Sequence, residues 1–177
     1  MRKRSMAAIV GAVAAIAIPL SATSANAVGV EGTTGIRNDN SQKCLAIPGG
    51  SSAANGTAAI QFTCDKAADG SWDTDQLWTW TLVSGATSTY TLKNYATGKC
   101  LAIGGGSHTL GAEAIQWPCN GSTEQQWIYD SSHRLWNKES DLCLAIPSAN
   151  VANGVAAVQW TCRDVSTNPE QKWDQVA

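Results

Sequence analysis

The sequence predicts an all-β protein with a closed body and threefold pseudosymmetry. The tetrapeptide Cys-Leu-Ala-Ile occurs three times, at 44–47, 100–103 and 143–146. The segments around these copies are short, rich in β-branched and aromatic residues, and separated by Gly, Pro, Asn and Ser, which is typical of strands and hairpins. No window beyond residue 27 has a 3.6-residue period over three turns. Three units are too few for a propeller, which usually has about 4–8 blades.

Residues 1–27 have the features of a secretory signal peptide. Three basic residues at 2–4 precede an apolar run at 6–20, and Ala25-Asn26-Ala27 has the small-x-small pattern of a cleavage site. The run of about 15 residues is shorter than the roughly 20 that a membrane span needs, and Pro19 interrupts it. We therefore expect a secreted, extracellular protein, and the alternative of an uncleaved membrane anchor is disfavoured.

The remaining chain, residues 28–177, is long enough for one domain with its own core. The full chain has 12 Lys and Arg against 14 Asp and Glu, and removal of the three basic residues at 2–4 leaves a net charge of −5. Phosphate backbones and anionic membrane surfaces select basic proteins. We therefore expect neither nucleic acid nor a membrane as a partner.

Several further residue types recur in register with Cys-Leu-Ala-Ile. Each unit has an asparagine six places and a hydroxyl residue three places before its first cysteine, and a glycine and an aromatic residue before its second. Each unit closes with Gln-x-Trp. In chain order these are Asn38, Asn94, Asn137; Ser41, Thr97, Ser140; Gly56, Gly111, Gly154; Phe62, Trp117, Trp160; and Gln76/Trp78, Gln125/Trp127, Gln171/Trp173. The repeats cover about 33–82, 88–130 and 133–175, and the first has a polar insertion at 65–75.

Six cysteines in an exported chain indicate three disulfides. Six cysteines allow 15 connectivities, and the repeat symmetry favours the one that joins equivalent positions within each unit. The predicted pairs are Cys44–Cys64, Cys100–Cys119 and Cys143–Cys162. The Cys and His spacing does not fit a metal site, so we expect no metal.

The three units resemble the ricin B-type lectin family, which includes the carbohydrate-binding modules of family 13 in secreted bacterial glycosidases. The resemblance rests on the Cys-Leu-x-Ile strand, the Gly-bearing turn, the aromatic residue before the second cysteine and the closing Gln-x-Trp, and it covers residues 33–175. It implies a β-trefoil with three pseudo-symmetric repeats and one disulfide per repeat. Six two-stranded hairpins would form a short barrel and its cap, with one potential sugar pocket per repeat.

Phe62, Trp117 and Trp160 match the position at which the family stacks an aromatic ring on a sugar; the alternative for these rings is core packing. The three Gln-x-Trp tryptophans are expected to meet in the core, and their glutamines to satisfy buried backbone groups. Trp72, Trp80 and Trp136 have no threefold counterparts, and no site is assigned to them.

The chain departs from the family pattern at three positions of each pocket. Ala46, Ala102 and Ala145 replace the aspartate of the family's Cys-Leu-Asp motif. Asp75, Glu124 and Glu170 replace the asparagine before Gln-x-Trp. Ile60, Ile115 and Val158 replace a glutamine, while Gln61, Gln116 and Gln159 follow one place later, where a strand turns its side chains to the other face. Either the sugar sites are lost, or the carboxylate has moved across each pocket.

The resemblance implies a carbohydrate-binding, lectin-like protein, a monomer with up to three weak sites that act together on a polysaccharide or glycan. The alternative is a trefoil that binds no sugar and contacts a protein partner, such as an inhibitor that uses its insertion at 65–75. We expect no enzyme activity and no cofactor. His108 and His133 lie at no repeated position. The sequence has no Ser-His-Asp order and no Gly-x-Ser-x-Gly motif of a nucleophilic hydrolase. It also gives no pair of carboxylates that would face each other across one cleft, as in a glycosidase.

Overall fold

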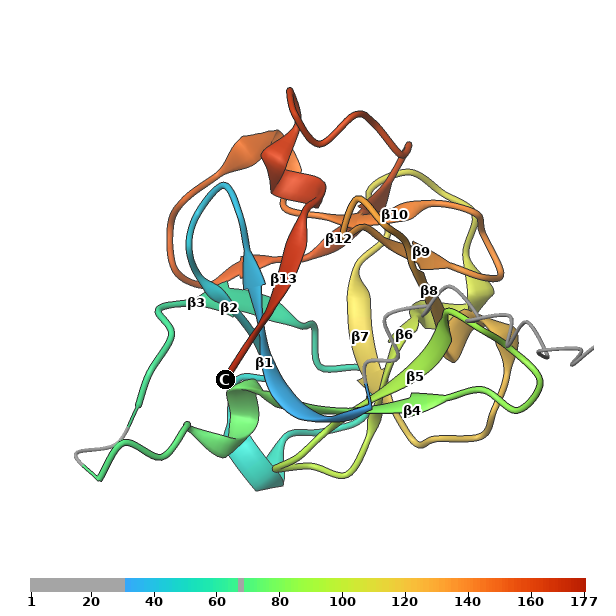
Figure 1. Cartoon of the computed structure of the whole chain (residues 1–177). Coiled ribbons are helices and arrows are strands. Elements are labelled where there is room, and N and C mark those ends of the chain that lie inside the picture. Colours follow the sequence, from blue (N-terminus) through green and yellow to red (C-terminus); the bar gives the residue numbers. More distant parts are fainter. Residues whose placement is uncertain (1–30, 67–68) are drawn as a thin grey trace, which may run out of the picture.

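The computed structural model describes residues 31–66 and 69–177, so the predicted signal peptide, residues 1–27, lies outside the described residues. Strands and short 3-10 turns make up the regular structure of this part of the chain (Figure 1). The strands are β1 (Gly32–Asn38), β2 (Cys44–Ala46), β3 (Ile60–Phe62), β4 (Leu77–Leu82), β5 (Thr89–Asn94), β6 (Cys100–Ile103), β7 (Ala114–Trp117), β8 (Gln126–Tyr129), β9 (Leu135–Asn137), β10 (Cys143–Ala145), β11 (Val155–Ala156), β12 (Val158–Trp160) and β13 (Trp173–Val176). The 3-10 turns are η1 (Gly50–Ser52), η2 (Thr74–Gln76), η3 (Gly104–Gly106), η4 (Thr123–Gln125), η5 (Pro147–Ala149) and η6 (Pro169–Gln171). No helix in this described part is long and apolar enough to cross a membrane.

Six strands form a barrel in which every neighbouring pair is antiparallel. The order is β13, β1, β4, β5, β8 and β9. The backbone N–H of Trp173 at the start of β13 donates to the carbonyl of His133, just before β9, at 2.9 Å and so closes the ring. In Figure 1 the last strand, in red, lies beside the first, in blue.

Three hairpins cap one end of the barrel, one from each repeat: β2–β3, β6–β7 and β10–β12. They meet in a closed cycle of backbone hydrogen bonds. The N–H of Ala59 donates to Ala114, that of Ala114 to Ala157, and that of Ala157 back to Ala59, at 2.8, 2.9 and 2.8 Å. All three alanines are fully buried. The barrel and its three-hairpin cap make the protein a β-trefoil, which confirms the predicted fold class.

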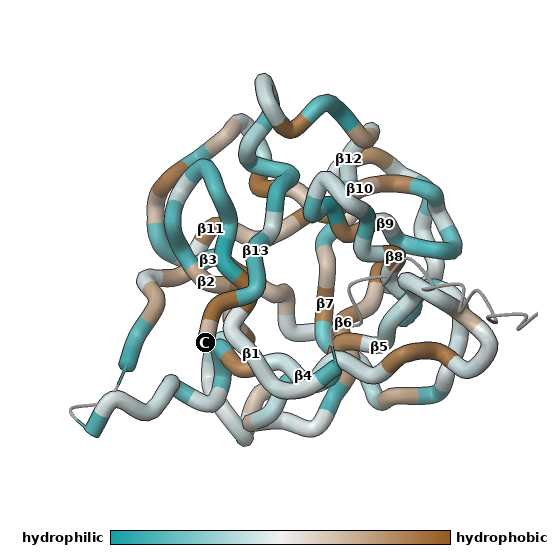
Figure 2. The backbone as a smooth tube through the Cα atoms, in the orientation of Figure 1, coloured by the Kyte–Doolittle hydropathy of each residue, from teal (hydrophilic) through white to brown (hydrophobic). Residues whose placement is uncertain are grey.

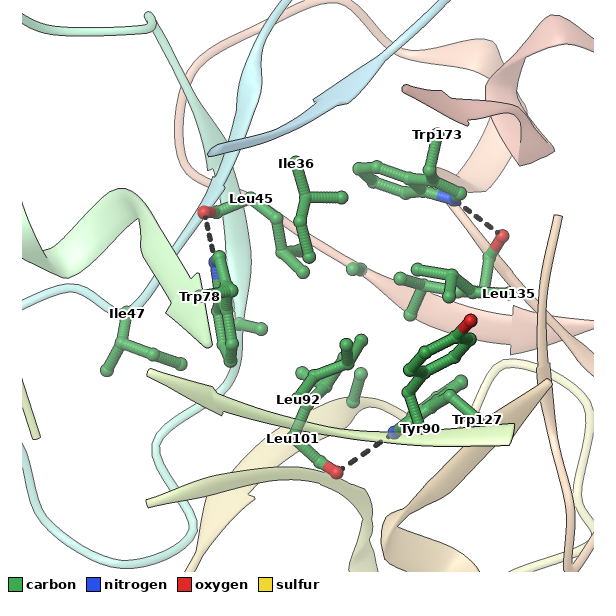
Figure 3. Packing of buried hydrophobic residues seen from close by; sticks show 14 of the residues in the cluster. Ile36, Leu45, Ile47, Trp78, Tyr90, Leu92, Leu101, Trp127, Leu135 and Trp173 are labelled. Carbon is green, nitrogen blue, oxygen red and sulfur yellow. Dashed lines mark hydrogen bonds between the residues drawn. The ribbon is translucent and has the colours of Figure 1, made fainter. Parts of the chain in front are cut away.

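The core lies between the barrel and its cap. Trp78, Trp127 and Trp173 of the Gln-x-Trp motifs are fully buried there. Each indole nitrogen donates to the backbone carbonyl of the leucine in the Cys-Leu-Ala-Ile strand of its own repeat, Leu45, Leu101 or Leu144, at 2.9–3.0 Å. Figure 3 shows the bonds of Trp78 to Leu45 and of Trp127 to Leu101. Along the backbone, hydrophilic and hydrophobic residues are interspersed within strands as well as loops (Figure 2). The same residue pair thus ties barrel to cap three times.

The disulfides join Cys44 to Cys64, Cys100 to Cys119 and Cys143 to Cys162, with Cα–Cα distances of 5.0–5.1 Å. The predicted connectivity, one bridge per repeat, is confirmed. Each bridge closes a loop of about 20 residues, for which the chain-entropy model gives a stabilisation of about 3 kcal/mol. Each bridge also holds the strand that precedes the second cysteine against the first strand of its hairpin.

The glutamines that follow Ile60, Ile115 and Val158 connect neighbouring repeats. Their side chains are fully buried, and each amide nitrogen donates to two backbone carbonyls of another repeat. Gln61 bonds Asn150 and Ala152, Gln116 bonds Ala53 and Ala54, and Gln159 bonds Ser107 and Thr109, all at 2.6–3.0 Å. Strand parity predicts that these side chains turn away from the pocket side, and the structure confirms it.

Replacing Gln116 with leucine is expected to lower the free energy of unfolding by about 1–3 kcal/mol, because two hydrogen bonds between repeats are lost. The carbonyl of Ala53 loses one of its two side-chain donors, and that of Ala54 keeps only the backbone and hydroxyl donors of Thr57. Chemical denaturation of Gln116→Leu would measure the loss. Gln175→Leu is the matched control, since the buried amide nitrogen of Gln175 has no hydrogen-bond partner. An equal loss in both variants would contradict a role for Gln116 between repeats.

Candidate functional site

Each repeat has a surface cavity at an equivalent place, and these three cavities are built from the same four positions. Every cavity is lined by the alanine of Cys-Leu-Ala-Ile, a β-branched residue, an aromatic residue and the acid before Gln-x-Trp. Cavity 1 has Ala46, Ile60, Phe62 and Asp75; cavity 2 has Ala102, Ile115, Trp117 and Glu124; cavity 3 has Ala145, Val158, Trp160 and Glu170. Their volumes are about 220, 310 and 410 Å³. The structure therefore brings together, in three places, residues that lie up to about 20–30 positions apart in the chain.

The aromatic rings form one exposed wall of each cavity. Phe62, Trp117 and Trp160 are 38%, 43% and 38% exposed, whereas the Gln-x-Trp tryptophans are fully buried. Each ring lies on the last residue of its cap hairpin, directly opposite a disulfide-bonded cysteine. A Cβ added at Gly56 or Gly111 of the preceding repeat would lie 3.9 or 3.6 Å from the ring of Trp117 or Trp160. The two indoles thus lie against the glycine turn of the preceding repeat and remain partly exposed to solvent.

The floor of each cavity is apolar. Ala46, Ala102 and Ala145 are only 2–3% exposed, and the β-branched residue beside each of them contributes the rest of the floor. These are the two positions at which the sequence lacks the family's aspartate and glutamine. No polar group of the cap hairpin therefore faces a ligand from below, and hydrogen bonding must come from the walls.

The acids supply a polar wall opposite the hairpin. Asp75, Glu124 and Glu170 are the middle residues of the turns η2, η4 and η6, and all three are half-buried. The repeated asparagines hold these turns in place from the next repeat. Asn94 donates to the carbonyl of Asp75 at 2.7 Å, Asn137 to that of Glu124 at 2.8 Å, and Asn38 to that of Glu170 at 2.9 Å.

The Gln-x-Trp glutamines fix the other side of these turns. Gln76 donates to the carbonyl of Thr63 and accepts from the N–H of Asp65, both close to the second cysteine of its repeat. Gln125 and Gln171 make the equivalent pairs of bonds in their repeats. The acid is therefore held between two buried amides on a rigid turn, which is the arrangement that a preorganised polar contact requires.

The carboxyl groups differ in their surroundings. Burial, reinforced by the charges of Asp73 and Asp65, raises the pKa of Asp75 to about 6. The carboxylate of Glu124 accepts a hydrogen bond from the hydroxyl of Ser122. A carboxylate beside an exposed aromatic ring over an apolar floor can accept hydroxyl hydrogens while the ring covers an apolar ligand face.

Several cavity residues were missed from the sequence, and two kinds of them recur between repeats. The rims contain the turn after Cys-Leu-Ala-Ile, namely Pro48 in cavity 1, Gly104 and Gly105 in cavity 2, and Pro147 to Ala149 in cavity 3. The residue after the second cysteine, Asp65 or Arg163, lines cavities 1 and 3. This residue could have been identified from the sequence by aligning the three repeats on their second cysteines.

The histidines lie outside the cavities. His133 contacts Asp174 at 2.6 Å beside the barrel closure, and His108 lies 3.7 Å from Glu139. Within residues 31–66 and 69–177, no three His, Cys, Asp or Glu side chains gather in a way that could hold a metal ion.

Solved structures with the same fold include designed and natural proteins. The designed threefold-symmetric protein ThreeFoil is 23% identical over 82% of this chain and 98% of its own, with a TM-score of 0.70. An exo-β-1,3-galactanase from Clostridium thermocellum is 22% identical over 81% of this chain, with a TM-score of 0.68. A Polyporus squamosus lectin, bound to the epitope Neu5Acα2-6Galβ1-4GlcNAc, is 20% identical over 82% of this chain, with a TM-score of 0.66. The matches span only 30% of the galactanase and 48% of the Polyporus lectin.

No curated protein matches the chain significantly by sequence. The family model of the ricin-type β-trefoil lectin domain matches residues 32–173, which is nearly all of the described chain. That range contains all three hairpins of the cap, all three disulfides and all three cavities. The chain therefore belongs to the ricin-type β-trefoil lectin domain family.

Proposed function

We propose that this protein is a secreted carbohydrate-binding protein that binds glycans through its three cavities and acts by binding, without catalysis. The observation that carries the proposal is the threefold recurrence of an exposed aromatic ring beside a half-buried carboxylate over an apolar floor. Family membership supports it. Export is supported by the signal-peptide features of residues 1–27.

The cavities suit the two chemistries of a sugar ring. The apolar face of the ring stacks on Phe62, Trp117 or Trp160, and the hydroxyl rim donates to Asp75, Glu124 or Glu170. In this arrangement the acceptor carboxylate comes from the turn at Gln-x-Trp, on the wall opposite the cap hairpin, whose alanine in the cavity floor replaces the family's aspartate. The three acids lie in the same cavities as these alanines, which supports a relocated carboxylate over a lost site.

Three separate cavities on one rigid body favour polymeric ligands. Each cavity is shallow and buries one side of a sugar, so each single site is expected to be weak. A monomer with three sites on one polysaccharide gains avidity because the second and third contacts are intramolecular. The Polyporus lectin, which shares this fold, is solved with a bound oligosaccharide.

Disabling cavities 2 and 3 together is expected to weaken binding to an immobilised polysaccharide or glycan array by more than about tenfold, through lost stacking and lost avidity. Trp117→Ala with Trp160→Ala removes both rings, and Glu124→Gln with Glu170→Gln removes both carboxylates. Glycan-array and polysaccharide pull-down binding of the two double variants measures the effect, with circular dichroism to show that each variant is folded.

Tyr95→Ala and Glu31→Gln are matched controls, because both side chains are exposed and lie outside the cavities. Unchanged glycan binding in the carboxylate variant would rule out the relocated carboxylate. Absence of glycan binding by the wild-type protein, together with co-purification of a secreted protein partner, would instead favour the protein-contact alternative.

A further inference from the structure

The three cavities share their shape but differ in charge, and one position accounts for much of the difference. The residue after the second cysteine is Asp65 in repeat 1, Asn120 in repeat 2 and Arg163 in repeat 3. Its backbone N–H donates to the Gln-x-Trp glutamine of the same repeat at 3.0, 3.0 and 2.8 Å. The backbone of this residue therefore occupies an equivalent place in every repeat, while its side chain is negative, neutral or positive.

Cavity 1 concentrates negative charge. Asp65, Asp73 and Asp75 all line it, and none of its described lining residues is a Lys or Arg. The backbone N–H of Asp73 donates to the carbonyl of Asp65 at 3.1 Å, so the insertion of repeat 1 brings the two residues together. The Oδ1 atom of Asp75 is buried without a hydrogen-bond partner. Burial is the main cause that raises the pKa of Asp75 to about 6, and the neighbouring charges of Asp73 and Asp65 add to it.

The nearest basic side chain of the insertion does not neutralise this cavity. Lys66 lies beside Asp65 and Asp73 in an adjoining depression. Its ammonium group donates to the carbonyl of Ala177 at 3.1 Å and lies 4.7 Å from the ring centre of Trp72. The cation is thus held by other partners, and it does not line cavity 1.

Cavity 3 has no excess of negative charge. Arg163 lines it together with Glu170, so the two formal charges cancel. Cavity 2 has Glu124 as its only charged lining residue, and that carboxylate already accepts a hydrogen bond from Ser122. A cationic ligand therefore meets three carboxylates in cavity 1, one in cavity 2, and a carboxylate with a competing guanidinium in cavity 3.

We propose that cavity 1 selects sugar units with a protonated amine, stacked on Phe62 with the ammonium group among Asp65, Asp73 and Asp75. The inference rests on the proposed carbohydrate binding and adds a ligand class to one of its sites. An acetylated amino sugar has the same ring but no charge and gains nothing from the three carboxylates. A protonated amine is attracted by the three carboxylates and offsets the repulsion among them.

The test uses two ligands that differ only in charge, the trimer of glucosamine and the trimer of N-acetylglucosamine. The protein is the Trp117→Ala, Trp160→Ala double variant, in which cavity 1 alone keeps its ring. Calorimetric titration slightly below neutral pH is expected to show binding of the amine trimer about tenfold tighter than that of the acetylated trimer. Asp65→Asn with Asp73→Asn, added to this variant, is expected to bring the two affinities within about twofold.

A second readout follows Asp75 itself. In the protein without ligand the pKa of the Asp75 carboxyl is about 6. When the glucosamine trimer is added, NMR is expected to show a lower pKa for this carboxyl, because the ammonium group favours the charged carboxylate. By linkage, the affinity for the protonated amine rises as the pH increases through about 6. If the three acids have only a structural role, the pKa of Asp75 does not change when the trimer is added, and the affinity does not change with pH around 6.

Glu31→Gln with Glu113→Gln is the matched control, because it removes two exposed acids outside the cavities and changes the net charge equally. Equal binding of the two trimers, or an equal effect of the control pair, would overturn the charge inference and leave glycan binding intact. Failure of the wild-type protein to bind either trimer or any glycan on an array would overturn both proposals.

Discussion

Trp127→Ala is expected to lower the free energy of unfolding by about 3–5 kcal/mol. The indole is fully buried between barrel and cap, and its nitrogen donates to the carbonyl of Leu101 at 3.0 Å. Its removal leaves a large cavity and a buried carbonyl without its donor. Chemical denaturation measures the loss as a lower midpoint at an unchanged slope.

Two further variants separate the effect of the lost hydrogen bond from that of the lost buried volume. Trp127→Phe keeps most of the buried apolar volume but cannot donate to Leu101, so it is expected to lose less than the alanine variant. Trp117→Ala is the exposed counterpart in the same repeat and is expected to lose less than about 1 kcal/mol. Similar losses for Trp127→Ala and Trp117→Ala would contradict the assignment of one ring to the core and the other to the cavity wall.

Repetition explains why the fold could be predicted from the sequence. A single Gln-x-Trp or a single cysteine pair says little, but three copies in register identify equivalent positions and so select one of 15 cysteine connectivities. The same alignment separates two classes of aromatic residue, of which Trp127 is buried and Trp117 exposed. Strand parity also predicted that Gln116 turns away from the cavity, since neighbouring residues in a strand face opposite sides.

The contacts between repeats could not be predicted in the same way. Asn38 recurs in register with Asn94 and Asn137, yet its partner is the carbonyl of Glu170, 132 residues away in the chain. A repeat alignment shows that a position matters in each unit but not which unit supplies its partner. The charge of cavity 1 was missed for a similar reason, because only the folded insertion places Asp73 beside Asp65.

The cycle of hydrogen bonds among three alanines at the centre of the cap is another contact between repeats that the sequence does not predict. Ala59, Ala114 and Ala157 each lie five places before the second cysteine of their repeat. Their backbones are joined head to tail, and each is fully buried within the core cluster. In the sequence these residues are unremarkable, because alanine is common and each lies beside larger strand residues. In the structure they are the points at which three hairpins approach one another most directly.

A larger side chain at this point is expected to destabilise the protein strongly. Ala114→Leu adds three carbons where the backbones of all three repeats meet, so the hairpins must separate or the leucine must adopt a strained rotamer. Separation also breaks buried hydrogen bonds of the cycle. Together these effects are expected to lower the free energy of unfolding by about 3 kcal/mol or more, measured by chemical denaturation.

The control is Ala152→Leu, which adds the same carbons at an exposed loop position and is expected to change stability by less than about 0.5 kcal/mol. Ala114→Gly tests the direction of the effect, because it keeps the backbone cycle and removes only one methyl group, with an expected loss of about 1 kcal/mol. If close approach of the three hairpins sets the requirement for alanine, leucine must be markedly worse than glycine. The reverse order would mean that the methyl contact, rather than the approach of the backbones, explains why all three repeats have alanine here.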